Sequence, residues 1–140
     1  MLSRMLYIST AVGPITTAVT GTILRSAQLH NPANGITGVL CQGQWKSHGV
    51  YLQVLEGERS QVDALYARIL QDKRHQNVVL LQQEDVARRR YGKWTMAHID
   101  LGHADPAKPA FDPYTATGEQ IMVKMDELIA SGKVMNAPVV

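Results

Sequence analysis

Apolar positions along the chain alternate or cluster in five short segments, and each segment predicts a β-strand. In the first, residues 5–9, the side chains of Met5, Tyr7 and Ser9 lie on one face and those of Leu6 and Ile8 on the other. The remaining four segments are residues 36–41, 50–55, 78–81 and 95–99. We expect residues 78–81 to form a central strand, because strands covered on both faces read as continuous apolar runs.

Helical periodicity predicts two helices among these strands and a third near the C-terminus. The first covers residues 17–30; we expect it to end near His30, because Pro32 biases Asn31 away from helical geometry. The second begins at a box of residues 60–63. Its apolar stripe is Val62, Leu65, Tyr66, Ile69 and Leu70. Thr117 caps the third, Gly132 ends it, and its stripe is Ile121, Met122, Met125, Leu128 and Ile129.

The order strand-helix-strand-strand-helix-strand-strand predicts an α+β, ferredoxin-like fold, a mixed five-stranded sheet with two helices on one face. The polar segment Gln42–His48 reads as a loop too long for a tight hairpin, with Trp45 exposed on it. Residues 104–113 include Pro106, Pro109 and Pro113 and read as a linker. We therefore expect a domain at residues 1–103, a linker at 104–116 and a C-terminal helical extension at 117–140.

Composition narrows the class of protein. The 140 residues are enough for one domain with a core of its own. Cys41 is the only cysteine, which excludes an intramolecular disulfide and a paired-cysteine metal or redox site, and we expect no metal. The net charge is only +2, and the one basic run, residues 88–90, reads as a solvated loop or strand end. No apolar stretch approaches the ~18 residues of a membrane span. We expect a cytoplasmic protein that binds neither nucleic acid nor membrane.

Three polar residues fall where a core is expected. Gln53 lies inside an otherwise apolar strand, where an unpaired amide costs roughly 1–3 kcal/mol. It is either bonded to the backbone like any core glutamine or part of a site. Tyr7 raises the same alternative, since a core tyrosine often reaches the surface with its hydroxyl. Asn31 follows the first helix and could be an ordinary helix-end residue.

Charged and aromatic residues later in the chain are equally open to two interpretations. Arg68 and Asp72 are spaced to share a helical face, as an exposed ion pair or as ligands. The basic residues at 73–75 would interact favourably with the C-terminus of the helix dipole or with a phosphate group. Trp94 and Met96 point to one face of the fifth strand, where such residues are usually core.

Together these segments closely resemble the BLUF family of blue-light receptors that use FAD. The resemblance rests on residues 6–9, 30–31, 35–38, 53–57, 72–75, 89–91 and 94–96, and it runs in order through roughly residues 4–100. Any one segment is weakly specific; the combination is specific. Pro32 stands where some relatives carry a polar residue, and the segment at 42–48 looks longer than the family's tight hairpin.

The resemblance implies a flavin ring between the two helices and the sheet. It implies that Tyr7 is the photochemical donor of an electron and a proton, with Gln53 bridging it to the ring and Asn31 bonding the ring's polar edge. Trp94 and Met96 would relay the signal. Apolar packing would come from Ile23 and Ile69, and contacts to the ring's pyrimidine end and the ribityl–phosphate chain from Arg68, Asp72, Arg74 and His75. FMN or riboflavin would fit the same ring contacts as FAD.

The resemblance also implies that the protein has no enzymatic activity and that a separate signalling protein carries its output. We expect the fifth strand to reposition the C-terminal helix against the free face of the sheet. Self-association is also expected, because a sheet face and an apolar helix stripe must be covered. Two alternatives remain: a small flavin-dependent reductase, which lacks support because no nicotinamide-binding fingerprint is found, and a flavin-free interaction module.

Overall fold

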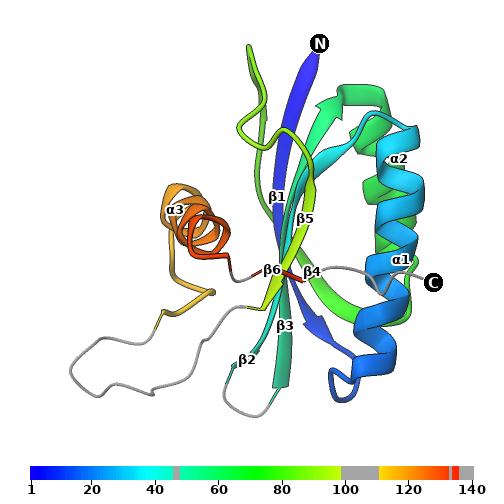
Figure 1. Ribbon diagram of the computed structural model, residues 1–140, viewed down its shortest axis with the longest axis vertical. Helices are drawn as coiled ribbons and strands as arrows, with labels where there is room; N and C mark the ends of the chain where they lie inside the picture. The colour runs from blue at the N-terminus through cyan, green and yellow to red at the C-terminus, as the bar shows by residue number, and fades with distance from the viewer. Residues whose placement is uncertain (46–47, 99–110, 133, 136–140) are drawn as a thin grey trace.

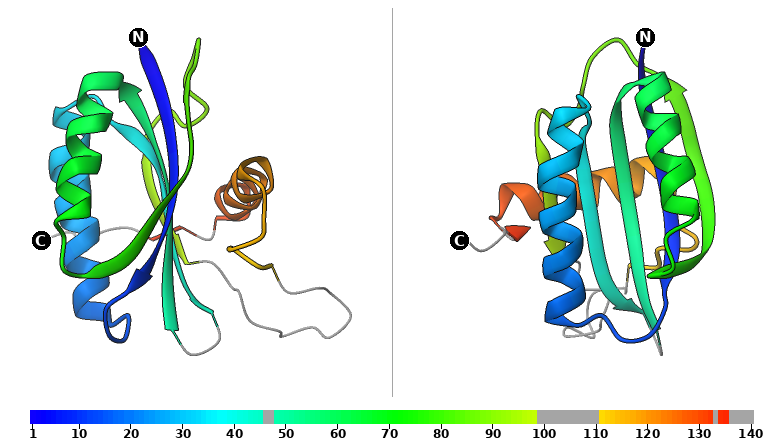
Figure 2. Two further views of the ribbon diagram at one scale, coloured as in Figure 1. Left: turned by 180° about the vertical axis from the view of Figure 1, so that it is seen from behind. Right: turned by 90° about the vertical axis from the view of Figure 1, so that its right-hand side faces the viewer.

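A computed structural model describes residues 1–45, 48–98, 111–132 and 134–135. Two helices lie on one face of a mixed sheet and a third lies on the other (Figures 1 and 2). The strands are β1 (Leu2–Ala11), β2 (Thr37–Trp45), β3 (His48–Glu58), β4 (His75–Asp85), β5 (Trp94–His98) and β6 (Val134–Met135). The helices are α1 (Thr17–Ala33), α2 (Arg59–Leu70) and α3 (Gly118–Ala130). The predicted ferredoxin-like class and element order are confirmed, with β6 as an added strand.

The sheet order is β4-β1-β3-β2-β5-β6. Among the described strands, only β2 and β5 pair in parallel, and the other neighbours are antiparallel. Gly38, at the start of β2, has φ +148°, and a Cβ atom there would overlap the carbonyl oxygen of Val54. Only glycine lets β2 approach β3 this closely.

Alternate residues of β1 and β3 serve opposite faces of the sheet. Met5 and Tyr7 pack with α2 residues, whereas Leu6 and Ile8 pack with α3 residues. The predicted alternation in the first strand is therefore confirmed. The helix α3 runs across the strands (Figure 2) and buries Ile121, Met122, Met125 and Leu128 against the sheet, as its apolar stripe predicts.

The segment at 78–81 is not a central strand. It belongs to β4, which lies at the edge of the sheet, and Val79, Leu80 and Leu81 are 51%, 42% and 38% exposed. Pairing with β1 is interrupted by register shifts, and Asn77 adopts a positive φ of 53°. Such bulges blunt an edge strand, which explains how an apolar run is tolerated there.

The hairpin between β2 and β3 is tight, contrary to the predicted long loop. Trp45 pairs directly with His48. The strand continues through its polar residues because Gln42 is buried and exchanges hydrogen bonds of 2.9 and 3.2 Å with Thr20 on α1. Trp45 is half-buried against the α3 side of the core rather than exposed.

Helix boundaries also differ from expectation. α1 continues past His30 to Ala33, with Pro32 in its last turn, where the backbone amides of Asn34 and Gly35 close short turns. A proline costs little in a turn that is already ending. α2 begins at Arg59 with no side-chain cap, so the predicted box at 60–63 is wrong. Leu70 is 49% exposed and does not belong to the buried stripe.

Candidate functional site

A cavity of about 250 Å³ lies between α1, α2 and the sheet. Its walls come from β1, β2, β3 and β5, from both helices and from the segment that joins α2 to β4. All nine residues expected to bind a cofactor line it, together with Trp94. These are Tyr7, Ile23, Asn31, Gln53, Arg68, Ile69, Asp72, Arg74 and His75. The structure therefore brings residues from distant parts of the chain to one place.

Tyr7 and Gln53 form a buried pair in the cavity wall. They stand directly opposite each other in the β1–β3 register, and both are at most 5% exposed. Directly opposed residues share a face of the sheet and lie in contact. The Tyr7 hydroxyl donates a hydrogen bond to Gln53 Oε1. Within the described part of the chain, Gln53 Nε2 has no acceptor of its own, so the amide has donors left for a ligand.

Burial sets the protonation state of Tyr7. Removal from water, and secondly the negative charge of Asp72, raise the pKa of the phenol far above its usual range. Tyr7 is thus a neutral hydrogen-bond donor at any physiological pH.

Asn31 presents a second unused amide. It lies in the last turn of α1 and is 5% exposed. Its backbone carbonyl accepts hydrogen bonds from the amides of Asn34 (3.1 Å) and Ile36 (2.8 Å). These bonds fix the backbone, while among the described residues its side chain has no protein partner. A buried, unpartnered amide in a cavity wall is a feature of a ligand site.

The polar end of the cavity is organised by Asp72. This residue lies beyond α2 and bonds Arg74, not Arg68: Arg74 Nε is 3.0 Å from each carboxylate oxygen. The hydrogen bonds from Arg74 lower the pKa of Asp72, which stays ionised. With Arg68 exposed nearby, this end of the cavity carries two guanidinium groups against one carboxylate. Such an excess of positive charge suits a phosphate.

His75 is held at both ring nitrogens. Its Nε2 lies 2.7 Å from the carbonyl oxygen of Ile69, which can only accept, so Nε2 carries the hydrogen. Its Nδ1 lies 2.7 Å from the Ser9 hydroxyl, which can donate or accept a hydrogen bond. The imidazole stands edge-on to the rings of Tyr7 and Tyr51, each 6.3 Å away between centroids.

Trp94 and Met96 take different positions. Trp94 lines the cavity, and its indole Nε1 is buried with no hydrogen-bond partner among the described residues. Met96 is fully buried behind the wall, packed with Ala11, Leu40 and Tyr51. Of the two residues expected to act as a relay, only Trp94 faces the cavity.

Six further cavity residues were not expected from the sequence: Ser26, Ala27, His30, Leu40, Tyr51 and Leu65. Periodicity contained a signal for several of them. Tyr51 precedes Gln53 by the strand period, and Ala27 and His30 continue the helical face that begins at Ile23. Each reads as core in isolation, so the signal becomes informative only once the cavity is known.

The cavity fits the ring end of a flavin. Apolar groups from Ile23, Leu65 and Ile69 line it together with polar groups from Asn31 and Gln53, and this mixed lining suits a flat ring with one polar edge. Its volume is below the roughly 300–1,000 Å³ of sites that enclose a drug-sized ligand.

A ferredoxin-like sheet with a walled cavity under two helices defines a ligand-binding α+β domain, and comparisons with known proteins give its family. The BLUF model, described as sensors of blue-light using FAD, matches residues 2–97. The chain belongs to the BLUF family and is a sensor of blue light that uses a flavin. The expected family, function class and cofactor class are confirmed.

Individual relatives agree with this assignment. A photoactivated adenylate cyclase subunit beta of Euglena gracilis is 34% identical over 96 residues, which is 68% of this chain and 11% of that protein. The dark-state structure of the BLUF protein BlrB is 25% identical with a TM-score of 0.73, covering 94% of this chain and 96% of that one. The ground state of BlsA, 23% identical, shares the fold with a TM-score of 0.80, covering 100% and 95% of the two chains.

The chain thus spans about a tenth of the length of the cyclase subunit that it matches. Within the described residues, no helix is long and apolar enough to cross a membrane.

Proposed function

We propose that Tyr7 and Gln53 are the photoactive pair of this sensor, and that the flavin ring lies against them in the cavity. The hydrogen bond from the Tyr7 hydroxyl to Gln53 Oε1, buried in the wall of a cavity that fits the ring, is the observation that carries the proposal. In this assignment Asn31 bonds the polar edge of the ring, and Ile23 and Ile69 pack on its faces. Arg68, Asp72, Arg74 and His75 hold the polar end and the tail.

The chemistry of the two side chains suits a reversible switch. When bound, the flavin would supply the absorption of blue light and an acceptor for the electron and the proton that Tyr7 gives up and later regains. Tyr7 holds a proton at its hydroxyl oxygen and delivers it along an existing hydrogen bond. Gln53 presents an acceptor on one side of its amide and donors on the other. Rotation or tautomerisation of this amide changes which group faces the cavity, without a lasting covalent bond.

The output runs through β5 and α3 in this proposal. Trp94 in the cavity wall and Met96 behind it respond to the new state of Gln53, and β5 carries the change towards α3. Residues 1–103 form the light-sensing domain, 104–116 a linker and 117–140 an extension with α3. A separate signalling protein reads the change, and the chain contributes no catalysis of its own. The likeness to the BLUF protein BlrB, over 94% of this chain, supports the light-sensing part of this arrangement.

Self-association and a cytoplasmic location complete the proposal. The apolar residues of β4 stay exposed although the bulges make that edge tolerable, and a second copy of the chain would cover them. A reducing cytoplasm suits a chain with one buried free thiol.

A visible absorption spectrum before and after blue light tests the central claim. We expect flavin bands that shift slightly to the red and recover in darkness, because a stronger hydrogen bond at the ring stabilises its excited state. Gln53→Leu removes the amide and should abolish the shift, whereas Gln61→Leu, on the exposed side of α2, should leave it intact. Bands that bleach or stay fixed in the unsubstituted protein, or steady light-independent NADH oxidation, would contradict the proposal.

A further inference from the structure

A buried carboxylate ties the strand of Gln53 to the segment that precedes β5. Glu56 lies further along β3, on the α3 side of the sheet, and is fully buried. Its oxygens accept hydrogen bonds from the backbone amides of Arg90 (2.9 and 3.0 Å) and Tyr91 (2.7 Å), and from Arg4 Nε at 2.9 Å. A buried charge is tolerated only with such partners. Glu56 therefore fixes the backbone of residues 90–91 to β3.

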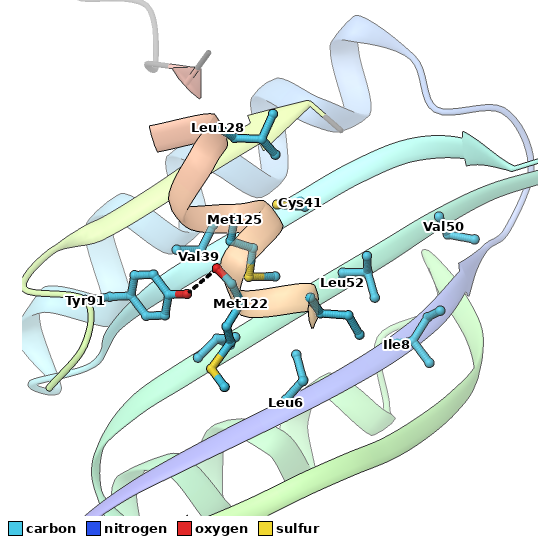
Figure 3. Packing of buried hydrophobic residues seen from close by; sticks show 12 residues of the cluster. Leu6, Ile8, Val39, Cys41, Val50, Leu52, Tyr91, Met122, Met125 and Leu128 are labelled. Atoms are coloured by element: carbon cyan, nitrogen blue, oxygen red, sulfur yellow. Dashed lines mark hydrogen bonds between the residues drawn. The ribbon is translucent and has the colours of Figure 1, made fainter. Parts of the chain in front are cut away.

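The side chains of the same two residues hold α3. The Arg90 guanidinium bonds Asp126 at 2.7 Å and Glu119 at 3.2 Å, two carboxylates on one face of α3. Tyr91 is 5% exposed, and its hydroxyl donates to the carbonyl oxygen of Met122 at 3.4 Å. Figure 3 shows the Tyr91 ring directed at the helix. We call Glu56, Arg90, Tyr91, Glu119 and Asp126 the Arg90 clamp.

The clamp also connects to other parts of the cavity wall. The guanidinium of Arg89 donates to Thr37 Oγ1 (2.7 Å) and to the carbonyl oxygens of Glu56 (2.9 Å) and Gly35 (2.8 Å). Gly35 belongs to the turn closed on the carbonyl of Asn31. The basic run at 88–90, which the sequence predicts to be solvated, thus includes two arginines with dense protein contacts. Trp94 lies four residues after Arg90 in the sequence.

A second cavity, of about 280 Å³, borders the clamp. Arg90, Tyr91, Thr95 and Asp126 line it together with Ile129 at the C-terminal end of α3. A densely packed contact between α3 and the segment before β5 would leave no space for the helix to change position. The side of α3 that faces residues 92–95 is instead incompletely packed, and the ion pairs of Arg90 are polar contacts that join it to the segment before β5.

We propose that Arg90 and Tyr91, positioned by Glu56, are the residues through which the light-induced change in the flavin cavity reaches α3. In this proposal the signal passes to α3 through the residues that precede β5. It does not need the covalent connection that follows β5. This inference rests on the proposed function and names positioning residues for its output. The clamp contacts β3 directly and the turn after Asn31 through the neighbouring Arg89, and it includes two residues shortly before Trp94. A displacement of any of these elements therefore changes the geometry at Glu119 and Asp126.

Hydrogen exchange of the full chain loaded with FAD tests the clamp, with the absorption shift recorded on the same samples. In the unsubstituted protein we expect light to change the exchange rates of amides in residues 118–130. In Arg90→Gln the absorption shift should remain, while the light-induced change over 118–130 should fall at least about fivefold, the lower end of typical coupling between sites. Asp126→Asn should act in the same direction, and Arg90→Lys should restore part of the response.

Arg59→Gln is the matched control, since Arg59 also pairs with acidic residues but on the α2–β4 side. It should leave both readouts unchanged. If Arg90→Gln destabilises the fold, Tyr91→Phe removes the hydroxyl that bonds Met122 and interacts with Asp126, leaves the ion pairs of Arg90 in place, and should give a smaller loss of the same sign. A merely structural role would raise exchange in dark and light by the same factor, and that result would overturn the proposal.

Two further outcomes separate the clamp from the photochemistry. A normal red shift without any light-dependent exchange in residues 118–130 of the unsubstituted protein would refute the clamp and leave the sensor proposal standing. No red shift in the unsubstituted protein would refute the proposed function, and the clamp with it.

Discussion

The two faces of the sheet use the same strands for opposite purposes. On the α3 face, residues such as Leu6, Leu52 and Met125 are at most 1% exposed and pack in one apolar cluster. The environment is dry enough that burial raises the pKa of Cys41 to about 12, so its thiol stays protonated. On the α1–α2 face, Tyr7 and Gln53 border an open cavity instead.

This difference shows how a small domain can keep a stable core beside an incompletely packed site. Each strand contributes alternate residues to the two faces, so stability and ligand binding are separated by a single residue step. The α3 face holds the sheet together while the other face tolerates a cavity and unpaired amides. Substitutions on the two faces should therefore have different consequences.

The largest expected effect is on signalling, from the cavity face. Tyr7→Phe removes the hydroxyl that donates to Gln53 and should abolish the light-induced red shift. Stability should change by only about 1 kcal/mol, the value of one net hydrogen bond. Tyr66→Phe is the control, because that ring lies 5.8 Å from Tyr7 but does not line the cavity. A Tyr7→Phe protein with a normal red shift would break the assignment of this face to photochemistry.

The α3 face should show the converse. Met125→Ala empties a fully buried position and should lower the free energy of unfolding by about 2–5 kcal/mol, measured by denaturant titration. The absorption shift should persist at temperatures where the variant is folded. Val123→Ala, on the exposed side of the same helix at 43% exposure, should change stability by no more than about 0.5 kcal/mol. Loss of the red shift in folded Met125→Ala would show that the two faces are not separable.

The smallest effect concerns the polar end of the cavity. Because the pKa of Asp72 lies below its usual 3.8 in the folded protein, its pairing with Arg74 stabilises the fold above that value. The contribution is lost as the pH falls through the lowered, folded-state pKa. Asp72→Asn should remove this component and cost less than about 1 kcal/mol at neutral pH, since the pair is partly solvated. Melting temperatures measured from about pH 6 to about pH 2.5 would reveal the difference. If Asp72→Asn and the unsubstituted protein showed the same dependence of melting temperature on pH, Asp72 would not contribute to the stability of the fold.

Local patterns predicted most of the elements. The alternation in β1, the Thr117 cap with its bond to the Gln120 amide at 3.1 Å, and the apolar stripe of α3 are all present in the structure. The errors have a common origin, because each concerns a contact made by a distant residue. Gln42 belongs to a strand because Thr20 forms hydrogen bonds with its amide, and Val79–Leu81 lie at an edge because β1 is the only described strand that pairs with β4.

The candidate site residues divide in the same way, into those that local pattern indicates and those that only distant contacts define. Tyr7, Asn31 and Gln53 were recognisable as polar groups in apolar surroundings, and resemblance to a family related them to a flavin. Their roles stay proposals, as do those of the other cavity residues. No periodicity indicated that Asp72 bonds Arg74 instead of Arg68, or that residues 89–91 join three elements, because those partners are chosen in space.

The sequence by itself determined the succession of elements, the two-sided burial of β1 and β3, and the identity of the polar residues at the cavity. These features depend on local backbone preference and on the period of side chains along one segment. Only the tertiary structure decided which strand lies at the edge, how tightly β2 turns into β3, and which acidic groups Arg90 holds. Those outcomes depend on hydrogen bonds and packing between residues far apart in the chain, which become defined only when the whole sheet has formed.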